Sequence, residues 1–146
     1  MNTHWKVDAA EPLDEALRDA ILDKIDEGSL ALSDLKDYFT VFTQICNVTE
    51  DIQDEVEKFD RTFLFRISGK PSARLIMKGC KFESDSAESA DADIVLDMSV
   101  ELTIGILSGR MDPTAAYMSG DLKVDGLIND AIRFRTILEL VLEELE

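Results

Sequence analysis

A change in hydrophobic period near residue 60 constrains the fold of this chain more than any other feature of its sequence. Before this point, apolar residues recur at spacings of three and four, which is typical of amphipathic helices. After it, the segments 61–68 and 72–84 are rich in β-branched and aromatic residues, and the "SGKPS" between them indicates a hairpin turn. The pattern therefore predicts a helical start followed by two antiparallel strands.

Three helices are predicted before the period changes. The first covers residues 11–28, the second begins at Ser33 or Asp34, and the third begins at Thr49. The first helix has one apolar stripe, formed by Leu13, Leu17, Ala20, Ile21 and Ile25. This stripe fits either packing onto the rest of the domain or contact with a partner, and we favour packing within the chain.

The chain returns to helix after a third predicted strand at residues 94–98. On this strand Asp97 shares a face with Val95, which favours an outward-facing, solvated carboxylate. Ser99 is a good N-cap for a helix over residues 100–107. Apolar residues surround nearly the whole of that helix, so we expect it to be buried on more than one side.

The stretch "MDPTAAYMSGDLKVDG", residues 111–126, packs three elements closely together. Asp112 is expected to cap a short helix that Gly120 ends, and a strand of about four residues follows before the turn at Gly126. In the last helix, residues 127–146, an apolar arc covers roughly half of the helical wheel. Its members are Leu127, Ala131, Phe134, Ile137, Leu138, Val141, Leu142 and Leu145.

Length and composition exclude several classes of protein. A chain of 146 residues is long enough for one domain with its own core. Its apolar runs are shorter than the roughly 18 residues of a membrane-spanning helix, so no stable membrane insertion is expected. The N-terminus lacks the basic start and apolar region of a secretory signal, which predicts a cytoplasmic location.

The residues that commonly carry catalysis are sparse or badly placed. Cys46 and Cys80 have neither metal-ligand nor redox spacing, so we expect both to be reduced core residues. The single histidine, His4, leaves the rest of the chain without a partner for a nucleophilic triad or a histidine-rich zinc site. The carboxylates form no recognisable acid/base or metal-ligand arrangement. The sequence predicts no enzyme, no metal site and no cofactor.

The formal net charge of −16 is unevenly distributed along the chain. Residues 1–57 contain fifteen acidic and four basic side chains, whereas residues 58–146 contain sixteen and eleven. Nucleic-acid binding is disfavoured, because phosphate contact needs a cationic face. The acidic N-terminal helices fit a solvated surface, which we favour, or a docking surface for a basic protein partner.

Residues 91–132 resemble the sterol carrier protein 2 (sterol-binding domain) family. The shared features are the "DADIVL" strand, the helix that ends in "SG", and then "DP", "MSG", "LKV" and Gly126 in the same order. The resemblance extends from about Tyr38 to the C-terminus, and it assigns residues 32–146 to the lipid-binding domain and residues 1–31 to an N-terminal helical extension. It implies an α+β fold with a curved, mainly antiparallel five-stranded sheet. Helices on one face would enclose a hydrophobic tunnel.

The resemblance implies non-catalytic binding and carriage of a hydrophobic ligand, such as a fatty acyl, isoprenoid or sterol-like lipid. The alternative is an accessory protein that docks on an enzyme complex and presents a hydrophobic substrate. Met111 and Met118 would give the cavity adaptable walls. The residues expected to line or border it are Leu102, Ile106, Met118, Leu122, Val124, Leu127, Phe134 and Leu138. The ligand's identity and the oligomeric state stay open.

Overall fold

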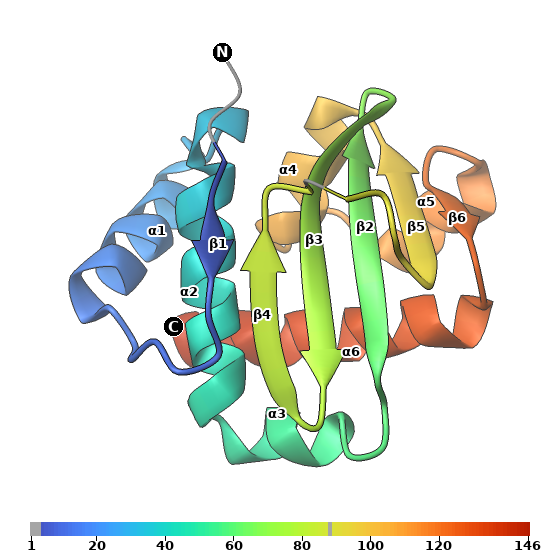
Figure 1. The fold of residues 1–146 in the computed structure, drawn as a ribbon. Coiled ribbons are helices and arrows are strands. Elements are labelled where there is room, and N and C mark those ends of the chain that lie inside the picture. The colour runs from blue at the N-terminus through green and yellow to red at the C-terminus, as the bar shows by residue number, and fades with distance from the viewer. Residues whose placement is uncertain (1–3, 88) are drawn as a thin grey trace.

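The computed structural model describes residues 4–87 and 89–146, and its centre is a six-stranded sheet (Figure 1). The strand order is β1-β4-β3-β2-β5-β6. β2 and β5 run parallel, and the other pairings among the described residues are antiparallel. The strands are β1 (Lys6–Val7), β2 (Arg61–Ile67), β3 (Lys70–Lys78), β4 (Lys81–Asp85), β5 (Ile94–Met98) and β6 (Lys123–Asp125).

The α+β fold class is confirmed, but the expectation of a five-stranded sheet was wrong: the sheet has six strands and is mixed. The additional strand, β1, comes from the N-terminal segment and pairs with the edge of β4, with Lys6 opposite Asp85. Two residues are too few to show a period of two, so the sequence contains no signal for this strand.

The single strand predicted over residues 72–84 was also wrong. The chain reverses at Gly79 and Cys80, both of which have positive φ, and this turn separates β3 from β4. A left-handed cysteine is uncommon, because a side chain with a Cβ disfavours that region. A Lys-Gly-Cys-Lys sequence is therefore a weak turn signal, and the apolar residues on both sides concealed the break.

The helices lie against one face of the sheet and along one edge (Figure 1). Their bounds are α1 (Glu15–Glu27), the 3-10 turn η1 (Leu32–Asp34), α2 (Leu35–Val48), α3 (Glu50–Glu55), α4 (Val100–Leu107), α5 (Pro113–Ser119) and α6 (Ile128–Leu145). α1 begins later than predicted, because the Asp14 side chain caps it by accepting the N–H of Leu17 at 3.0 Å. No helix within the described ranges is long and apolar enough to cross a membrane.

The core between the sheet and the helices is rich in aromatic rings. Phe65 of β2 lies 5.1 Å from the Phe39 ring of α2 and 5.3 Å from the Phe134 ring of α6, measured between centroids. Phe42 of α2 also stacks on Phe134, with 6.1 Å between the ring centroids. These four side chains are almost fully buried. They join the sheet to both long helices.

The two cysteines differ in their surroundings. Cys46 of α2 is fully buried, and this burial raises the pKa of its thiol. Cys80 is only half-buried and packs against the margin of the core. Both thiols are free.

Candidate functional site

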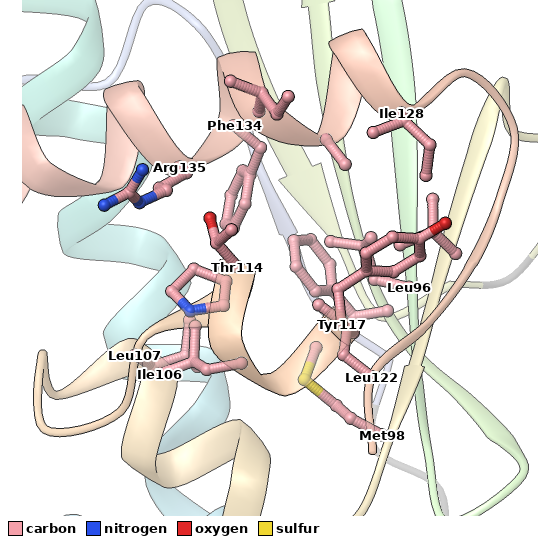
Figure 2. A pocket seen from close by; sticks show the side chains of 15 residues that line it. Leu96, Met98, Ile106, Leu107, Thr114, Tyr117, Leu122, Ile128, Phe134 and Arg135 are labelled. Carbon is pink, nitrogen blue, oxygen red and sulfur yellow. The ribbon is translucent and has the colours of Figure 1, made fainter. Parts of the chain in front are cut away.

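An apolar pocket lies between the sheet, α4, α5 and the first half of α6 (Figure 2). Its volume, counted as the space open to the centre of a water molecule, is about 80 Å³. β2 and β5 contribute Phe65, Leu96 and Met98 to the lining, and α4 contributes Ile106 and Leu107. The remaining walls come from α5, the β6 region and α6: Pro113, Thr114, Tyr117, Leu122, Val124, Ile128, Ala131, Ile132, Phe134 and Arg135.

The short helix α5 forms because its two ends are fixed by local interactions. Both carboxylate oxygens of Asp112 accept backbone N–H groups, from Thr114 and Ala115, at 3.3 Å. Gly120 ends the helix in the left-handed conformation, with φ of 87°. Neighbouring residues on a helix point about 100° apart, so Tyr117 faces the pocket while Met118 faces outward.

The strand β6 is positioned by Gly126. This glycine has φ of 133°, and a Cβ at this position would lie 2.8 Å from the carbonyl oxygen of Asp93. The close approach brings β6 alongside β5 and directs the chain into α6. Leu122 and Val124 consequently reach the pocket from the sheet side.

Four of the eight side chains predicted for the site line the pocket: Ile106, Leu122, Val124 and Phe134. They come from α4, α6 and the segment around β6, so the fold brings together residues that are up to 28 positions apart in sequence. Ile106, Leu122 and Phe134 are buried, and Val124 is half-buried. Their role in ligand binding stays a prediction.

The other four predicted residues lie elsewhere. Leu102 is buried in α4 but is not among the lining side chains, and Leu138 faces a neighbouring hollow. Met118 and Leu127 point outward, with exposed fractions of 80% and 64%. Together with the half-exposed Ile132, these two side chains give the outer surface around α5 and the start of α6 an apolar character.

Sequence reasoning did not assign Met98, Tyr117, Ile128 or Arg135 to the site. Ile128 and Arg135 lie just outside the apolar arc predicted for the last helix, so the arc gave no reason to assign them to the site. Phe134, which is within the arc, is buried in the core and also lines the pocket, and Ile128 and Arg135 lie beside it in the lining.

A second, more polar hollow adjoins the pocket. Its volume on the same measure is about 320 Å³, and it shares Ile106, Pro113 and Arg135 with the pocket. Two cations, Arg110 and Arg135, and two carboxylates, Asp112 and Glu139, lie around it. The apolar pocket and the charged hollow thus meet at Arg135.

The pocket wall formed by α4 is anchored to α2 by one buried hydrogen bond. The Tyr38 hydroxyl donates to the carbonyl oxygen of Leu107 at 2.7 Å, at the end of α4. Burial of the ring, with a smaller contribution from Cys46, raises the pKa of Tyr38 well above its usual value. The phenol is therefore neutral at physiological pH and keeps its proton for this bond.

The described residues offer no cluster of metal-ligating side chains at the site. In residues 4–87 and 89–146, no three His, Cys, Asp or Glu side chains are grouped so that they could hold a metal ion. The hydrophobic tunnel expected from the sequence stays a prediction, because the space found here is a small pocket. Its lining can exclude water and hold an apolar group.

A sequence model of the SCP-2 sterol transfer family matches residues 42–139. Hydroxysteroid dehydrogenase-like protein 2 of Rattus norvegicus is 32% identical over 95 residues, which is 62% of this chain and 18% of that protein. The chain thus spans about a fifth of the length of the curated relatives that it matches.

Two solved structures have a similar fold. Sterol Carrier Protein 2 from Yarrowia lipolytica, in its apo form, has a TM-score of 0.56 at 20% identity, with 71% of this chain and 88% of that chain covered. The UbiJ-SCP2 ubiquinone synthesis protein has a TM-score of 0.57 at 15% identity, with 70% and 90% covered. At these identities the likeness shows a shared architecture.

Proposed function

The chain belongs to the SCP-2 sterol transfer family, and from this premise we propose that it binds and carries a hydrophobic ligand without catalysing a reaction. The observation that supports the proposal most directly is the pocket at α5 and α6, whose lining is almost entirely apolar. Fatty acyl, isoprenoid and sterol-like lipids all belong to the class of ligand that such a wall can hold. We place the ligand against Ile106, Leu122, Val124 and Phe134.

Apolar contact alone supplies enough free energy for such a ligand. Burial of each methylene contributes about 0.8 kcal/mol, so a medium-length acyl chain gains several kcal/mol after the costs of ordering. Apolar contact is also tolerant of shape, and Met98 in the wall has a flexible side chain that adapts to different ligands. The expected binding is of moderate affinity and broad specificity.

A ligand of that size needs more room than the structure provides. Pockets for small molecules typically measure about 300–1,000 Å³, compared with about 80 Å³ here. Binding therefore requires wall residues to move. Tyr117 and Ile128 lie on the outer side of the pocket and are partly exposed, so their side chains can turn outward at low cost.

The second candidate function is that of an accessory protein that presents a hydrophobic substrate to an enzyme. It is favoured by the acidic character of residues 1–57, which include the exposed side of α1. It is also favoured by the curated relatives, in which the matched region is part of a much longer chain. This function would require a basic protein partner, bound in a salt-sensitive manner.

Native mass spectrometry of the protein purified without detergent tests the first function. A discrete adduct of a few hundred daltons that is lost on denaturation is expected, and organic extraction would identify it. If no adduct appears and the protein also fails to take up added lipids, carriage is excluded. Pull-down experiments at low and high salt then test the accessory role, which predicts a basic partner retained only at low salt.

A further inference from the structure

The apolar pocket has a charged end, which is formed by Arg135. Figure 2 shows the guanidinium group of Arg135 at one end of the pocket, directed away from Tyr117 and Ile128 at the other end. The same side chain is one of those that line the pocket. A ligand that fills the pocket would therefore end beside a cation.

The guanidinium group is incompletely satisfied by the protein. Its Nε lies 3.3 Å from a carboxylate oxygen of Asp112 and 3.3 Å from one of Glu139. Despite these contacts, Nε is buried and makes no hydrogen bond of good geometry within the described part of the chain. A buried donor without an acceptor is costly, so an acceptor supplied by a ligand would stabilise this site.

The two carboxylates differ in how tightly they are held. Both oxygens of Asp112 cap α5, so this residue stays in place. Glu139 lies one helical turn beyond Arg135, and 58% of its side chain is exposed. Glu139 can turn into solvent, and a ligand anion can then take its position at little electrostatic cost.

A second polar group lies at the same end. Figure 2 shows the Thr114 hydroxyl on the Arg135 side of the pocket. A hydroxyl donates one hydrogen bond, and an arginine donates several in a fixed fork that matches a carboxylate. Apart from the Tyr117 hydroxyl, the remaining side chains that line the pocket are apolar.

We propose that the ligand is an amphiphile with a small anionic head group such as a carboxylate, which Arg135 binds while the tail occupies the apolar pocket. This inference rests on the proposed lipid-binding function and specifies the chemistry of its ligand. The head group would lie in the neighbouring hollow, whose volume of about 320 Å³ leaves space for it. Glu139 would act as an internal competitor of the head group.

The test compares two probes with the same twelve-carbon chain, dodecanoate with an anionic head group and dodecanol with a neutral one, by calorimetric titration of the full chain at pH 8. We expect Arg135→Gln to weaken dodecanoate binding about tenfold to a hundredfold, as for loss of a charged hydrogen bond, and to change dodecanol binding less than about threefold. Arg135→Lys should restore part of the affinity for dodecanoate. Glu139→Gln should strengthen dodecanoate binding a few-fold by removing the competing charge.

Arg133→Gln is the matched control. Arg133 is on the same helix and is equally exposed, 40% against 41% for Arg135, but it pairs with Glu55 away from the pocket. Its replacement should leave the affinity for both probes unchanged. Equal losses for the two probes in Arg135→Gln, or equal effects of the two arginine variants, would overturn the inference and leave lipid binding intact. If neither probe binds the unaltered protein, the proposed function fails as well.

Discussion

At the scale of single residues, Ile106 belongs both to the buried core and to the pocket lining. Its side chain is 2% exposed and contributes to the wall beside α5. The helix α4 carries a second isoleucine, Ile104, which faces the opposite direction, toward Leu30 and the end of α1. The same substitution at these two positions therefore separates the pocket from the general packing of α4.

We predict that Ile106→Trp reduces the uptake of a fluorescent fatty-acid probe by about tenfold or more, because the larger ring fills a pocket of about 80 Å³. Overpacking costs about 1–3 kcal/mol of stability in a closely packed core such as that around Ile106. Ile104 is only partly buried, so Ile104→Trp should lower the melting temperature less and leave uptake normal. Normal uptake by Ile106→Trp would place the ligand elsewhere.

Asp34 contributes to the stability of the fold through its buried carboxylate. Its carboxylate is buried beneath Lys24 of α1 and also accepts the N–H of Ala31 at 2.9 Å. Burial acts to raise the pKa of Asp34, but the hydrogen bonds from Lys24 and Ala31 and the charge of Lys24 outweigh it, so the pKa is lowered. The ionised form of Asp34 therefore stabilises the fold.

Because the pKa of Asp34 is lower in the folded state, its contribution is complete above the usual value of 3.8 and is lost as the pH falls through the folded value. We predict that Asp34→Asn lowers the free energy of unfolding by about 1–3 kcal/mol at pH 7. The difference from the unaltered protein should shrink below about pH 4. Urea titrations at several pH values measure this, and a constant difference down to pH 2 would contradict it.

At the scale of elements, the connection from β6 to α6 depends on close backbone contact. Gly126 has both a positive φ and a neighbouring carbonyl at 2.8 Å from its ideal Cβ. Gly120, at the end of α5, has a positive φ of 87° but nothing within 4 Å of its ideal Cβ. A substitution at Gly120 therefore tests the strain of a positive φ alone, whereas a substitution at Gly126 tests this strain and steric overlap together.

We predict that Gly120→Ala costs about 1 kcal/mol of unfolding free energy, from the strain of the left-handed conformation alone. Gly126→Ala should cost about 3 kcal/mol or more, because β6 must also move away from β5. Ligand uptake should fall only for Gly126→Ala, since β6 carries part of the pocket wall. Chemical denaturation and probe uptake test both statements, and equal losses of stability would mean that the close approach is unimportant.

The helix α1 is attached to the body of the protein through specific contacts at its two ends. Arg110, in the connection between α4 and α5, donates to the carbonyl oxygen of Ile25 at 2.9 Å. Arg18 donates to the carbonyl oxygen of Glu144 at 2.7 Å. The predicted packing of this helix within the chain is confirmed, and Ile21 of its apolar stripe is buried in the core.

At the scale of the whole molecule, the described N-terminal residues, 4–31, take part in the sheet and the core. Val7 of β1 and Ile21 of α1 are each 2% exposed, and β1 covers the edge of β4. The Trp5 ring stacks on Phe39 of α2 at 6.4 Å. The division of the chain at residue 31 remains a prediction that a truncation can test.

We predict that removal of residues 1–31 lowers the free energy of unfolding by roughly 3–6 kcal/mol, because two large apolar side chains lose their burial. It should also promote association, since the edge of β4 becomes free to pair with another chain. Urea denaturation and size-exclusion chromatography measure the two effects. An unchanged midpoint and a monomeric elution would show that residues 32–146 form an independent domain.

The sequence by itself determined the elements whose boundaries depend on local interactions. Asp112 and Gly120 enclose α5, Ser99 begins α4, and Gly126 precedes α6, because a cap or a left-handed glycine acts within a few residues of the chain. The same local signals, with the family resemblance, predicted the α+β fold and four of the residues that line the pocket.

The tertiary structure decided what depends on distant partners. β1 exists only because Lys6 and Val7 meet β4, and the parallel pairing of β2 with β5 joins segments separated by a long connection. The outward orientation of Met118 and the position of Arg135 beside the pocket depend on how α5 and α6 pack. A hydrophobic pattern records that a side chain avoids water, whereas the neighbour that covers it is selected by packing across the whole molecule.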